Sequence, residues 1–278
     1  MKDIQPQKKL LFVAVPLVVL SVIWFAFPAS LILEGEYKNS GNIYSPEINN
    51  EYMYFSGWYN DADYPRDKIY RTSDYKNIET VISLDKQIGD PTILNNKMYY
   101  TYSMDSTDIT KHRIAVSTTN NNGESWSAPQ FILNNAWLPS IVQSDKVYLY
   151  YTIADGTTNQ LTRAELSTYD VVTDIKTVSC TDGVNPVNVD VIYSNNKYYL
   201  AGDYWEGSVY SIGLWESNDG IIFNPLQTPI VSPHGDGIIV RTPYIEIDND
   251  DIKIWYAQQD ADWWTNSIYY NNIKGVLT

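Results

Sequence analysis

Asp90-Pro91-Thr92-Ile93, followed by Met98-Tyr99-Tyr100, is one copy of a phrase that this chain repeats. The phrase joins a Pro-containing start, a few strand-forming residues, a polar tight turn and a Tyr-rich strand. The other copies are Ser45-Pro46-Glu47-Ile48 with Tyr52-Met53-Tyr54-Phe55, Leu138-Pro139-Ser140-Ile141 with Val147-Tyr148-Leu149-Tyr150, Asp190-Val191-Ile192 with Lys197-Tyr198-Tyr199-Leu200, and Thr242-Pro243-Tyr244-Ile245 with Ile252-Lys253-Ile254-Trp255. The proline slot, filled by Val191 in the fourth copy, falls at 46, 91, 139, 191 and 243, in steps of 45, 48, 52 and 52 residues. A strand-built repeat of roughly 40–50 residues is typical of β-propeller blades.

A second periodic feature supports the first. A further strand pattern follows each phrase, at residues 69–73, 114–117, 161–164, 212–215 and 268–270. Its steps of 45, 47, 51 and 56 residues lengthen along the chain in the same way as those of the phrase. The sequence therefore predicts an all-β, five-bladed β-propeller over residues 34–278, and an irregular β-sandwich with similar hairpins is the alternative. The fifth repeat is short of an outer strand, which residues 36–44 can supply so that the sheet edges are covered.

Composition and charge exclude several classes of protein. The 278 residues include 24 Tyr and 9 Trp, and the net charge is −14. Nucleic acids and anionic lipid headgroups attract surfaces rich in Lys and Arg, so this negative charge argues against both as partners. The single Cys180 and the two histidines exclude an intramolecular disulfide and make a zinc site of the usual His/Cys kind improbable. No cofactor is required, although the acidic loops are compatible with Ca²⁺.

The N-terminal segment predicts a membrane anchor. Residues 10–33 carry no charge, Lys8 and Lys9 precede them, and Glu34 follows. This length spans a bilayer with some tilt, and the basic flank predicts a short cytoplasmic N-terminus at residues 1–9. The C-terminal propeller is then expected outside the cytoplasm, on a single-pass protein whose residues 10–33 contact the lipid bilayer. A cleaved signal peptide is the competing interpretation, but its apolar run is normally shorter.

Aligning the repeats predicts a site on the propeller axis. The phrase begins with Ser45, Asp90, Leu138, Asp190 and Thr242, and Glu47, Thr92, Ser140, Ile192 and Tyr244 follow two positions later. Because the innermost strands of a propeller start around one axis, Glu47, Asp90 and Asp190 are expected to face one pocket. Arg241 stands beside the fifth start, and His234 lies in the loop that leads to it.

Two turns carry a resemblance to known propellers. Thr119-Asn120-Asn121-Asn122-Gly123-Glu124-Ser125-Trp126 resembles the Asp-box of sialidases, with Asn121 in the Asp slot. Ser217-Asn218-Asp219-Gly220-Ile221-Ile222-Phe223 resembles the serine-x-aspartate-glycine turn of propeller glycosidases. Both predict a tied hairpin with an aromatic residue packed beneath it, rather than catalysis. A sialidase would also need an arginine triad, and only Arg241 lies near a strand start.

Over residues 36–278 the chain resembles the five-bladed propeller glycosidases of the arabinanase/β-xylosidase and invertase/levansucrase types. The resemblance rests on the number of blades, on Asp90-Pro91 and on the Asn-x-Tyr-Tyr strand pattern. It implies carboxylates at inner-strand starts that act as base, orienting group and acid, as glycoside hydrolysis requires. The catalytic candidates are Asp90, Asp190, Glu47 and Glu206, the last as the nearest substitute for the family's acid motif. The substrate-binding candidates are Trp58, Trp137, Trp205, Arg241, His234 and Trp263.

Two functions remain open at this point. One is a membrane-anchored, extracytoplasmic glycoside hydrolase that acts on a polysaccharide or oligosaccharide through axial carboxylates. The alternative is a non-catalytic propeller that binds a glycan or a protein and has lost part of the catalytic set, since Ser45 and Leu138 stand where carboxylates are expected. Convergence of Asp90, Asp190 and one Glu within about 5–10 Å would favour the first function. A pocket lined by Trp with fewer than two facing carboxylates would favour the second.

Overall fold

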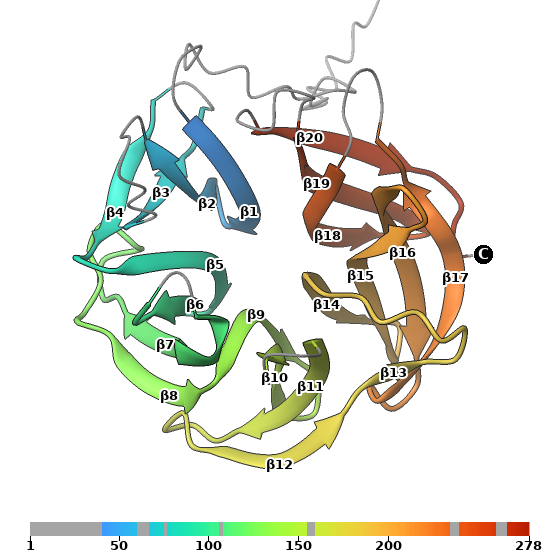
Figure 1. The fold of residues 1–278 in the computed structure, drawn as a ribbon, viewed down its shortest axis with the longest axis horizontal. Coiled ribbons are helices and arrows are strands. Elements are labelled where there is room, and N and C mark those ends of the chain that lie inside the picture. Colours follow the sequence, from blue (N-terminus) through green and yellow to red (C-terminus); the bar gives the residue numbers. More distant parts are fainter. Residues whose placement is uncertain are drawn as a thin grey trace, which may run out of the picture.

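Five twisted β-sheets surround a central axis like the blades of a propeller (Figure 1). The structure is a computed structural model, and it describes residues 41–59, 67–74, 77–105, 108–154, 159–233, 239–259 and 266–277. The predicted five-bladed propeller is thereby confirmed. The proposed anchor, residues 10–33, lies outside the described residues. Within those residues no helix is long and apolar enough to cross a membrane.

Each blade is an antiparallel sheet whose first strand lies nearest the axis. Blade 1 is β1 (Gly41–Asn49), β2 (Tyr52–Tyr59), β3 (Lys68–Thr72) and β4 (Glu79–Ser83). Blade 2 is β5 (Gln87–Leu94), β6 (Lys97–Ser103), β7 (His112–Thr118) and β8 (Gln130–Asn134), with a short 3-10 helix at Ile109–Lys111. Blade 3 is β9 (Ala136–Gln143), β10 (Val147–Ala154), β11 (Asn159–Leu166) and β12 (Val172–Thr177).

Blades 4 and 5 depart from this pattern. Blade 4 is β14 (Val189–Ser194), β15 (Lys197–Glu206), β16 (Val209–Ser217) and β17 (Ile222–Val231), and β13 (Ser179–Cys180) adds a parallel strand beside β17. Blade 5 has β18 (Ile239–Asp248), β19 (Asp251–Gln259) and β20 (Asn266–Ile273) in the described part of the chain. Residues 41–44 of the segment expected to cover the edge of blade 5 belong to β1, and residues 36–40 lie outside the described residues. Asn42 of β1 pairs in parallel with Asn266, so the start of β1 lies beside β20, the third strand of blade 5.

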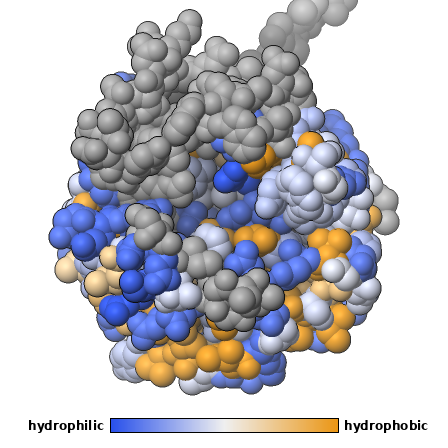
Figure 2. Space-filling model, in the orientation of Figure 1, coloured by the Kyte–Doolittle hydropathy of each residue, from blue (hydrophilic) through white to orange (hydrophobic). Residues whose placement is uncertain are grey.

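The hydrophobic core is divided among the interfaces between neighbouring blades. Five clusters of buried side chains lie between blades 1 and 2, 2 and 3, 3 and 4, 4 and 5, and 5 and 1. The last cluster closes the circle and contains Met53, Phe55, Tyr70, Trp255, Ile268 and Tyr270. The outer strands contribute less, and hydrophobic side chains gather on the rim over β12, where Ile175 is 58% exposed (Figure 2). Each blade is therefore held mainly by its two neighbours.

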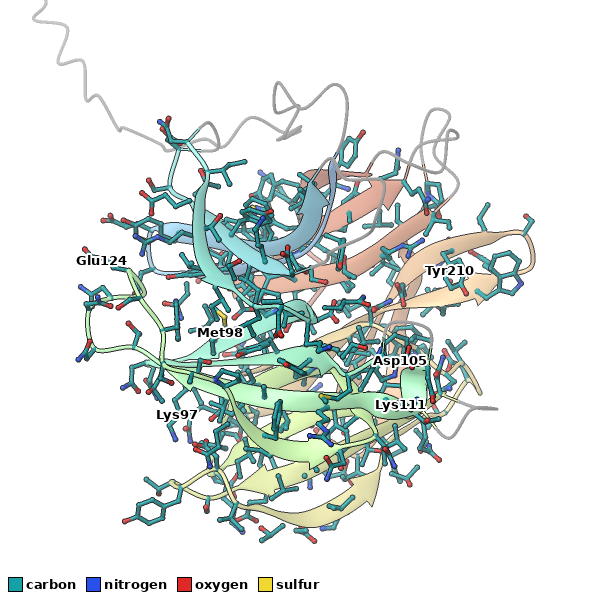
Figure 3. All side chains as sticks on the ribbon, turned by 60° about the vertical axis from the view of Figure 1, so that its left-hand side comes forward. Lys97, Met98, Asp105, Lys111, Glu124 and Tyr210 are labelled. Carbon is teal, nitrogen blue, oxygen red and sulfur yellow. The ribbon has the colours of Figure 1, made fainter. Side chains whose placement is uncertain are left out.

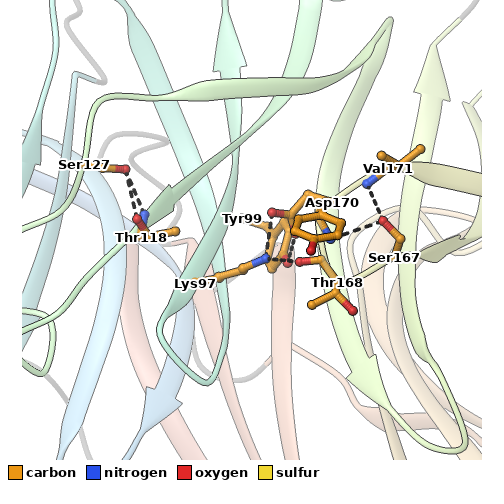
Figure 4. Close-up of polar contacts among 9 residues, drawn as sticks. Lys97, Tyr99, Thr118, Ser127, Ser167, Thr168, Asp170 and Val171 are labelled. Carbon is orange, nitrogen blue, oxygen red and sulfur yellow. Dashed lines mark hydrogen bonds and ion pairs between the residues drawn. The ribbon is translucent and has the colours of Figure 1, made fainter.

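Polar contacts also stabilise the interface between blades 2 and 3. Lys97 and Tyr99 of β6 both reach Asp170, which lies in the turn before β12 in blade 3 (Figure 4). The Lys97 Nζ–Asp170 Oδ2 and Tyr99 Oη–Asp170 Oδ1 distances are both 2.7 Å. Burial and the neighbouring Asp170 carboxylate raise the pKa of the Tyr99 hydroxyl, so this group remains a hydrogen-bond donor.

The two predicted turn motifs each tie one blade to the preceding blade. Thr119 Oγ1 donates to Asn121 Oδ1 at 2.8 Å, and Ser217 Oγ donates to Asp219 Oδ1 at 2.9 Å. The glycine that follows, Gly123 or Gly220, has a positive φ and lies against a tyrosine hydroxyl of the preceding blade. The structural role predicted for both turns is confirmed.

In both places an arginine completes what we call the Tyr-Arg clamp. Arg71 lies 4.4 Å from the ring of Tyr52, and Arg163 lies 4.3 Å from the ring of Tyr148. Each guanidinium also donates to a backbone carbonyl of the incoming turn, that of Asn122 or of Asp219. The sequence Tyr-x-Tyr in β2 and in β10 thus forms the same kind of surface, on which the turn of the following blade packs.

Candidate functional site

The innermost strands bring two sets of side chains to the axis. The upper axial set lies at the bulges of β1, β5, β9 and β18 and just before β14, and it consists of Ser45, Asp90, Leu138, Asn188 and Thr242. The lower axial set, two residues further along each strand, is Glu47, Thr92, Ser140, Asp190 and Tyr244. A cavity of about 30 Å³ opens on the axis between members of both sets, and Glu47, Asp90 and Asp190 line it together. The structure therefore brings these three candidates into one place, in a space about the size of one water molecule.

The lower axial set forms a circular chain of hydrogen bonds. Four of its side chains accept a backbone N–H from the following blade, and the fifth, Tyr244, donates its hydroxyl to the Ile48 carbonyl at 3.1 Å. The four accepted bonds are Ile93 N to Glu47 Oε1 (2.9 Å), Ile141 N to Thr92 Oγ1 (3.2 Å), Val191 N to Ser140 Oγ (2.9 Å) and Ile245 N to Asp190 Oδ2 (2.9 Å). Every innermost strand is thereby attached to the next one, and the last returns to the first.

This circle corrects the alignment of the fourth repeat. Asp190 was expected to correspond to Asp90, but its hydrogen bond to the next blade places it in the lower set with Glu47. Asn188 takes the upper position and Val189 the proline slot. The fourth copy lacks the proline that marks the other four, so its register was not visible in the sequence. It also pairs with β15 without the bulge found in the other innermost strands.

The upper axial set is held in a strained backbone conformation. Four of its members have a left-handed backbone, at φ 53°, 54°, 55° and 50° for Ser45, Asp90, Leu138 and Thr242. Such values are uncommon outside glycine, particularly for residues as bulky as Leu and Thr. Hydrogen bonds compensate, because Ser45 N donates to Thr242 Oγ1 at 3.0 Å and Leu138 N donates to Thr101 Oγ1 at 2.9 Å.

Asp90 is the carboxylate of the upper axial set. Its Oδ1 accepts the hydroxyl of Ser45 at 2.6 Å, and its backbone N–H donates to Ser56 Oγ at 3.2 Å. The side chain is half-buried, whereas Glu47 and Asp190 are buried. Asp90 is therefore the axial carboxylate best placed to meet a ligand.

Burial controls the charge of the other two axial carboxyls. Burial, together with the nearby Asp190, raises the pKa of Glu47 well above its usual value. Burial raises the pKa of Asp190 to about 6, against hydrogen bonds from Ile245 N and Ser140 Oγ that lower it. Burial therefore favours the neutral form of both carboxyls.

One carboxyl near the axis was not predicted. Asp203 in β15 is buried, and it accepts hydrogen bonds from Asn188 N at 3.0 Å and from Asn188 Nδ2. Burial raises its pKa to about 6, and the positive charge of Arg241 opposes that rise. Its only sequence signal is a single Asp within the buried run of β15, so its partner Asn188 could not be inferred.

The remaining candidates lie away from the axial cavity or outside the described residues. Glu206 is exposed at the end of the β15–β16 hairpin, so it does not converge with the axial carboxylates. Trp205, on the same hairpin, is 57% exposed and packs edge-on against Tyr210 at 5.0 Å. Trp137 packs against His112 at 5.6 Å, and Arg241 donates to Gln259 Oε1 at 2.8 Å. His234, Trp263 and the side chain of Trp58 lie outside the described residues.

The Trp205 hairpin stands on the same face as the axial cavity. Val189, at the start of β14, pairs with Gly202, so residues beyond Gly202 extend past the start of the innermost strand. Figure 3 shows Tyr210 at the same end of the blades as Asp105 and Lys111, and Glu124 at the opposite end. Within the described residues, no group of three or more His, Cys, Asp or Glu side chains is placed to hold a metal ion.

Comparisons with known proteins agree with this architecture. No family model matches the chain, and no curated protein matches it by sequence. Among solved structures, a thermostable family-43 glycoside hydrolase shares 17% identity at a TM-score of 0.59, over 84% of this chain and 89% of that one. The GH43_1 enzyme from Xanthomonas citri, complexed with xylose, shares 14% at 0.63, over 87% and 89%. Native Bacillus subtilis arabinanase shares 14% at 0.56, over 84% and 94%.

These likenesses show the class of fold. The chain has the five-bladed propeller fold of the arabinanase and xylosidase type of glycoside hydrolase, as the resemblance in its sequence implied. At these identities the likeness extends to the fold, while activity has to be argued from the site itself.

Proposed function

We propose that this chain is a carbohydrate-binding propeller with the glycosidase fold, in which the buried axial carboxyls fasten blades together and do not perform hydrolysis. One observation carries the proposal: Glu47 and Asp190 each accept a backbone N–H from the next blade. The other oxygen of Asp190 is also used within the protein, since Ser140 Oγ of the preceding blade donates to Oδ1 at 3.0 Å.

Glycoside hydrolysis needs one carboxylic acid and one carboxylate on opposite faces of the scissile bond. With Glu47 and Asp190 committed to the fold, Asp90 is the remaining axial carboxylate with partial exposure. The upper positions in blades 1, 3 and 4 are Ser45, Leu138 and Asn188, none of which carries a charge. This set can hydrogen-bond a sugar hydroxyl but does not provide the pair that catalysis requires.

Carbohydrate is the ligand class that the surroundings favour. Solved structures with this fold include an enzyme complexed with xylose and a protein described as an RGII complex. Here, Trp205 and Tyr210 present aromatic surface on the same face as the axial cavity. Tyr and Trp offer flat apolar faces with a polar edge, which suits sugar rings.

We also propose that residues 10–33 anchor the chain in a membrane, with the propeller outside the cytoplasm. The support is the 24-residue uncharged segment and the two lysines before it. Protease added to intact cells should then digest the propeller and leave residues 1–9 protected. Protection of the propeller in intact cells would refute this topology.

The function is tested by binding and turnover measured on the same full-length protein. Arabino- and xylo-oligosaccharides are offered to the wild type, to Asp90→Asn and to Trp205→Ala, with calorimetry for binding and product analysis for hydrolysis. We expect binding without turnover, and weaker binding in both variants. If the wild type binds none of these sugars while it is folded, the proposal fails.

Hydrolysis stays a second candidate because of one specific observation. Glu47, whose pKa is raised by burial, and the more exposed Asp90 line the same cavity, and a carboxyl of raised pKa beside a second carboxylate is the pairing that glycosidases use. In this case the wild type would release sugar, and both Asp90→Asn and Glu47→Gln would abolish that release while each variant remained folded. Turnover that survives Asp90→Asn would exclude the axial site as its source.

A further inference from the structure

A second concave site lies at the other end of the innermost strands of blades 1 and 2. We call it the amide groove, and its volume is about 610 Å³. This volume is within the roughly 300–1,000 Å³ usual for small-molecule sites. The groove lies between the β1–β2 turn, the β5–β6 turn and the Asp-box-like turn, whereas the axial cavity lies beside residues 45–47 of β1 and 90–92 of β5. Figure 3 shows Glu124, in the Asp-box-like turn, at the end of the blades opposite Tyr210.

The wall of the groove is rigid and aromatic. Tyr52 and Tyr54 come from blade 1, and Trp126 comes from blade 2 and meets Tyr54 edge-on with ring centroids 6.3 Å apart. Arg71 stacks on Tyr52 and is held by Glu79, with 2.8 Å between Arg71 Nε and Glu79 Oε2. The aromatic surface is therefore fixed before any ligand arrives, which lowers the entropic cost of binding.

The rim of the groove is formed largely by side-chain amides. Asn49, Asn50, Asn95, Asn96, Asn120 and Asn122 all line it. Three of these amides make hydrogen bonds within the protein, since Asn50 donates to Asn49 Oδ1 and Asn96 donates to the Thr119 carbonyl. No hydrogen bond is made by the side chains of Asn95, Asn120 and Asn122 among the described residues, and all three are exposed.

Trp126 contributes its ring to the groove. The residue is half-buried and lines the groove, while its Nε1 is buried and has no acceptor within the described part of the chain. Trp126 therefore offers an aromatic face to an occupant of the groove.

The second Tyr-Arg clamp shows that the groove is not a necessary product of the fold. In blades 3 and 4 the aromatic residue of the turn is Phe223, which is fully buried against Tyr150. Tyr198 fills the space there, with its hydroxyl 2.7 Å from Ser144 Oγ. The position of Tyr198 is taken by Met98 in blade 2, and Asn122 is an extra residue in the turn before Gly123. The two copies of the clamp therefore differ in the side chains beside the turn, with Met98 and Trp126 in one and Tyr198 and Phe223 in the other.

The lining also decides between classes of ligand. Six amides and three aromatic rings face the groove, and Glu51 is the charged side chain among its lining residues. Phosphates and nucleic acids require Lys or Arg, and a divalent cation requires several carboxylates. Amides that can both donate and accept, next to aromatic faces, match the alternating hydroxyls and apolar faces of an uncharged sugar.

We propose that the amide groove is a second carbohydrate site, which takes one or two residues of a neutral glycan independently of the axial face. The class of ligand rests on the proposed function, whereas the location and the lining of the groove are given by the structure itself. With one site at each end of the blades, a single propeller would engage two segments of glycan.

The test compares matched variants of the full-length protein in calorimetric titrations with xylotetraose and arabinotetraose. Asn120→Ala and Trp126→Phe alter the groove, and Trp126→Phe keeps an aromatic ring against Tyr54. Asn218→Ala is the matched control, because Asn218 holds the same place as Asn120 in the equivalent turn of blade 4. Asp90→Asn alters the axial face. Unfolding curves confirm that each variant is folded. If Trp126→Phe is unstable, Asn120→Ala alone tests the groove, because Asn120 is exposed.

We expect two binding events in the wild type. One should weaken about tenfold or more in Asn120→Ala and Trp126→Phe, and remain unchanged in Asn218→Ala and Asp90→Asn. Binding that is lost only in Asp90→Asn would overturn the groove proposal and leave the axial proposal standing. Binding that is lost only in the groove variants would overturn the axial proposal and leave the groove proposal standing. An equal loss in Asn120→Ala and Asn218→Ala would also refute the groove.

Discussion

Glu47 illustrates how an axial carboxyl can serve the fold. It is buried, its pKa is raised by that burial, and its Oε1 accepts the N–H of Ile93 in the next blade. Burial favours the neutral form, in which the carboxyl accepts from a buried backbone donor without burying a charge. The bond to the next blade gives Glu47 a structural contact that its place near the axis did not predict.

Glu47→Gln and Glu47→Ala should separate these roles. Glutamine has nearly the shape of protonated glutamate and keeps the acceptor for Ile93 N, so the free energy of unfolding at pH 7 should be almost unchanged. Alanine leaves that N–H without a partner and opens a cavity, so it should cost about 2–3 kcal/mol. Urea unfolding of both variants measures the difference. A large loss in Glu47→Gln would mean that Glu47 is ionised in the folded protein.

Gly123 is required by contact as well as by conformation. Its φ is +79°, and a Cβ there would lie 2.3 Å from the hydroxyl of Tyr54. Gly123→Ala should therefore cost about 3 kcal/mol or more in unfolding free energy, through backbone strain and overpacking together. Gly183→Ala is the control, because Gly183 has φ +77° and open space around its Cβ. It should lose only about 1 kcal/mol, and equal losses would show that the contact with Tyr54 carries no energy.

At the scale of elements, the five innermost strands are joined by side chains and not by a continuous ladder. Ser140 is central in this circle, because its hydroxyl accepts from Val191 N and donates to Asp190 Oδ1. The strand β9 is thereby attached to β14, and Asp190 carries the attachment on to β18. The sequence predicted each of these strands, but the bonds between them join residues about fifty positions apart.

Ser140→Ala should break one link of the circle. It leaves the N–H of Val191 without its acceptor and removes a hydrogen bond from Asp190, at a cost of about 2–3 kcal/mol in unfolding free energy. The matched control is Ser211→Ala, since Ser211 is fully buried and its Oγ has no partner among the described residues. That variant should be neutral or slightly stabilising in the same thermal or urea unfolding experiment. Comparable losses in the two variants would contradict the circular chain of hydrogen bonds.

At the scale of the whole molecule, acidic groups from different blades share the region around the axis. Burial raises the pKa of Asp190 and of Asp203 to about 6, and also raises the pKa values of Glu47 and Glu246. Carboxyls with lowered pKa values, such as those of Asp108 and Asp174, lie at the surface, where solvent screens their contribution. The interior therefore determines how stability depends on pH.

Stability should fall as the pH rises from about 4 to about 6 and beyond. In this range the unfolded chain releases protons that the folded protein retains, so the unfolded state binds fewer protons and its relative free energy falls. Below about pH 4 both states are protonated at these sites and the effect disappears. Urea unfolding between pH 4.5 and 8 measures the slope, and the Asp203→Asn variant should flatten it. A free energy of unfolding that increases steadily from pH 5 to 8 would contradict these raised pKa values.

The sequence alone predicted the five blades, the positions of the first three strands of each blade, and the two tied turns, because each depends on local patterns that recur along the chain. It also brought Glu47, Asp90 and Asp190 to one axis. It could not assign Asp190 to the lower axial set, remove Glu206 from the site or find Asp203.

Those features were decided by the tertiary structure. The hydrogen-bond partner of Asp190 is a backbone N–H of the following blade, and the charge of Glu47 depends on burial by several blades at once. The amide groove likewise exists because turns of blades 1 and 2 meet, while the equivalent turns of blades 3 and 4 are filled by Tyr198. Local patterns specify strands and turns, whereas the environment of a side chain on the axis or in a groove is created by residues that become neighbours only when the circle of blades closes.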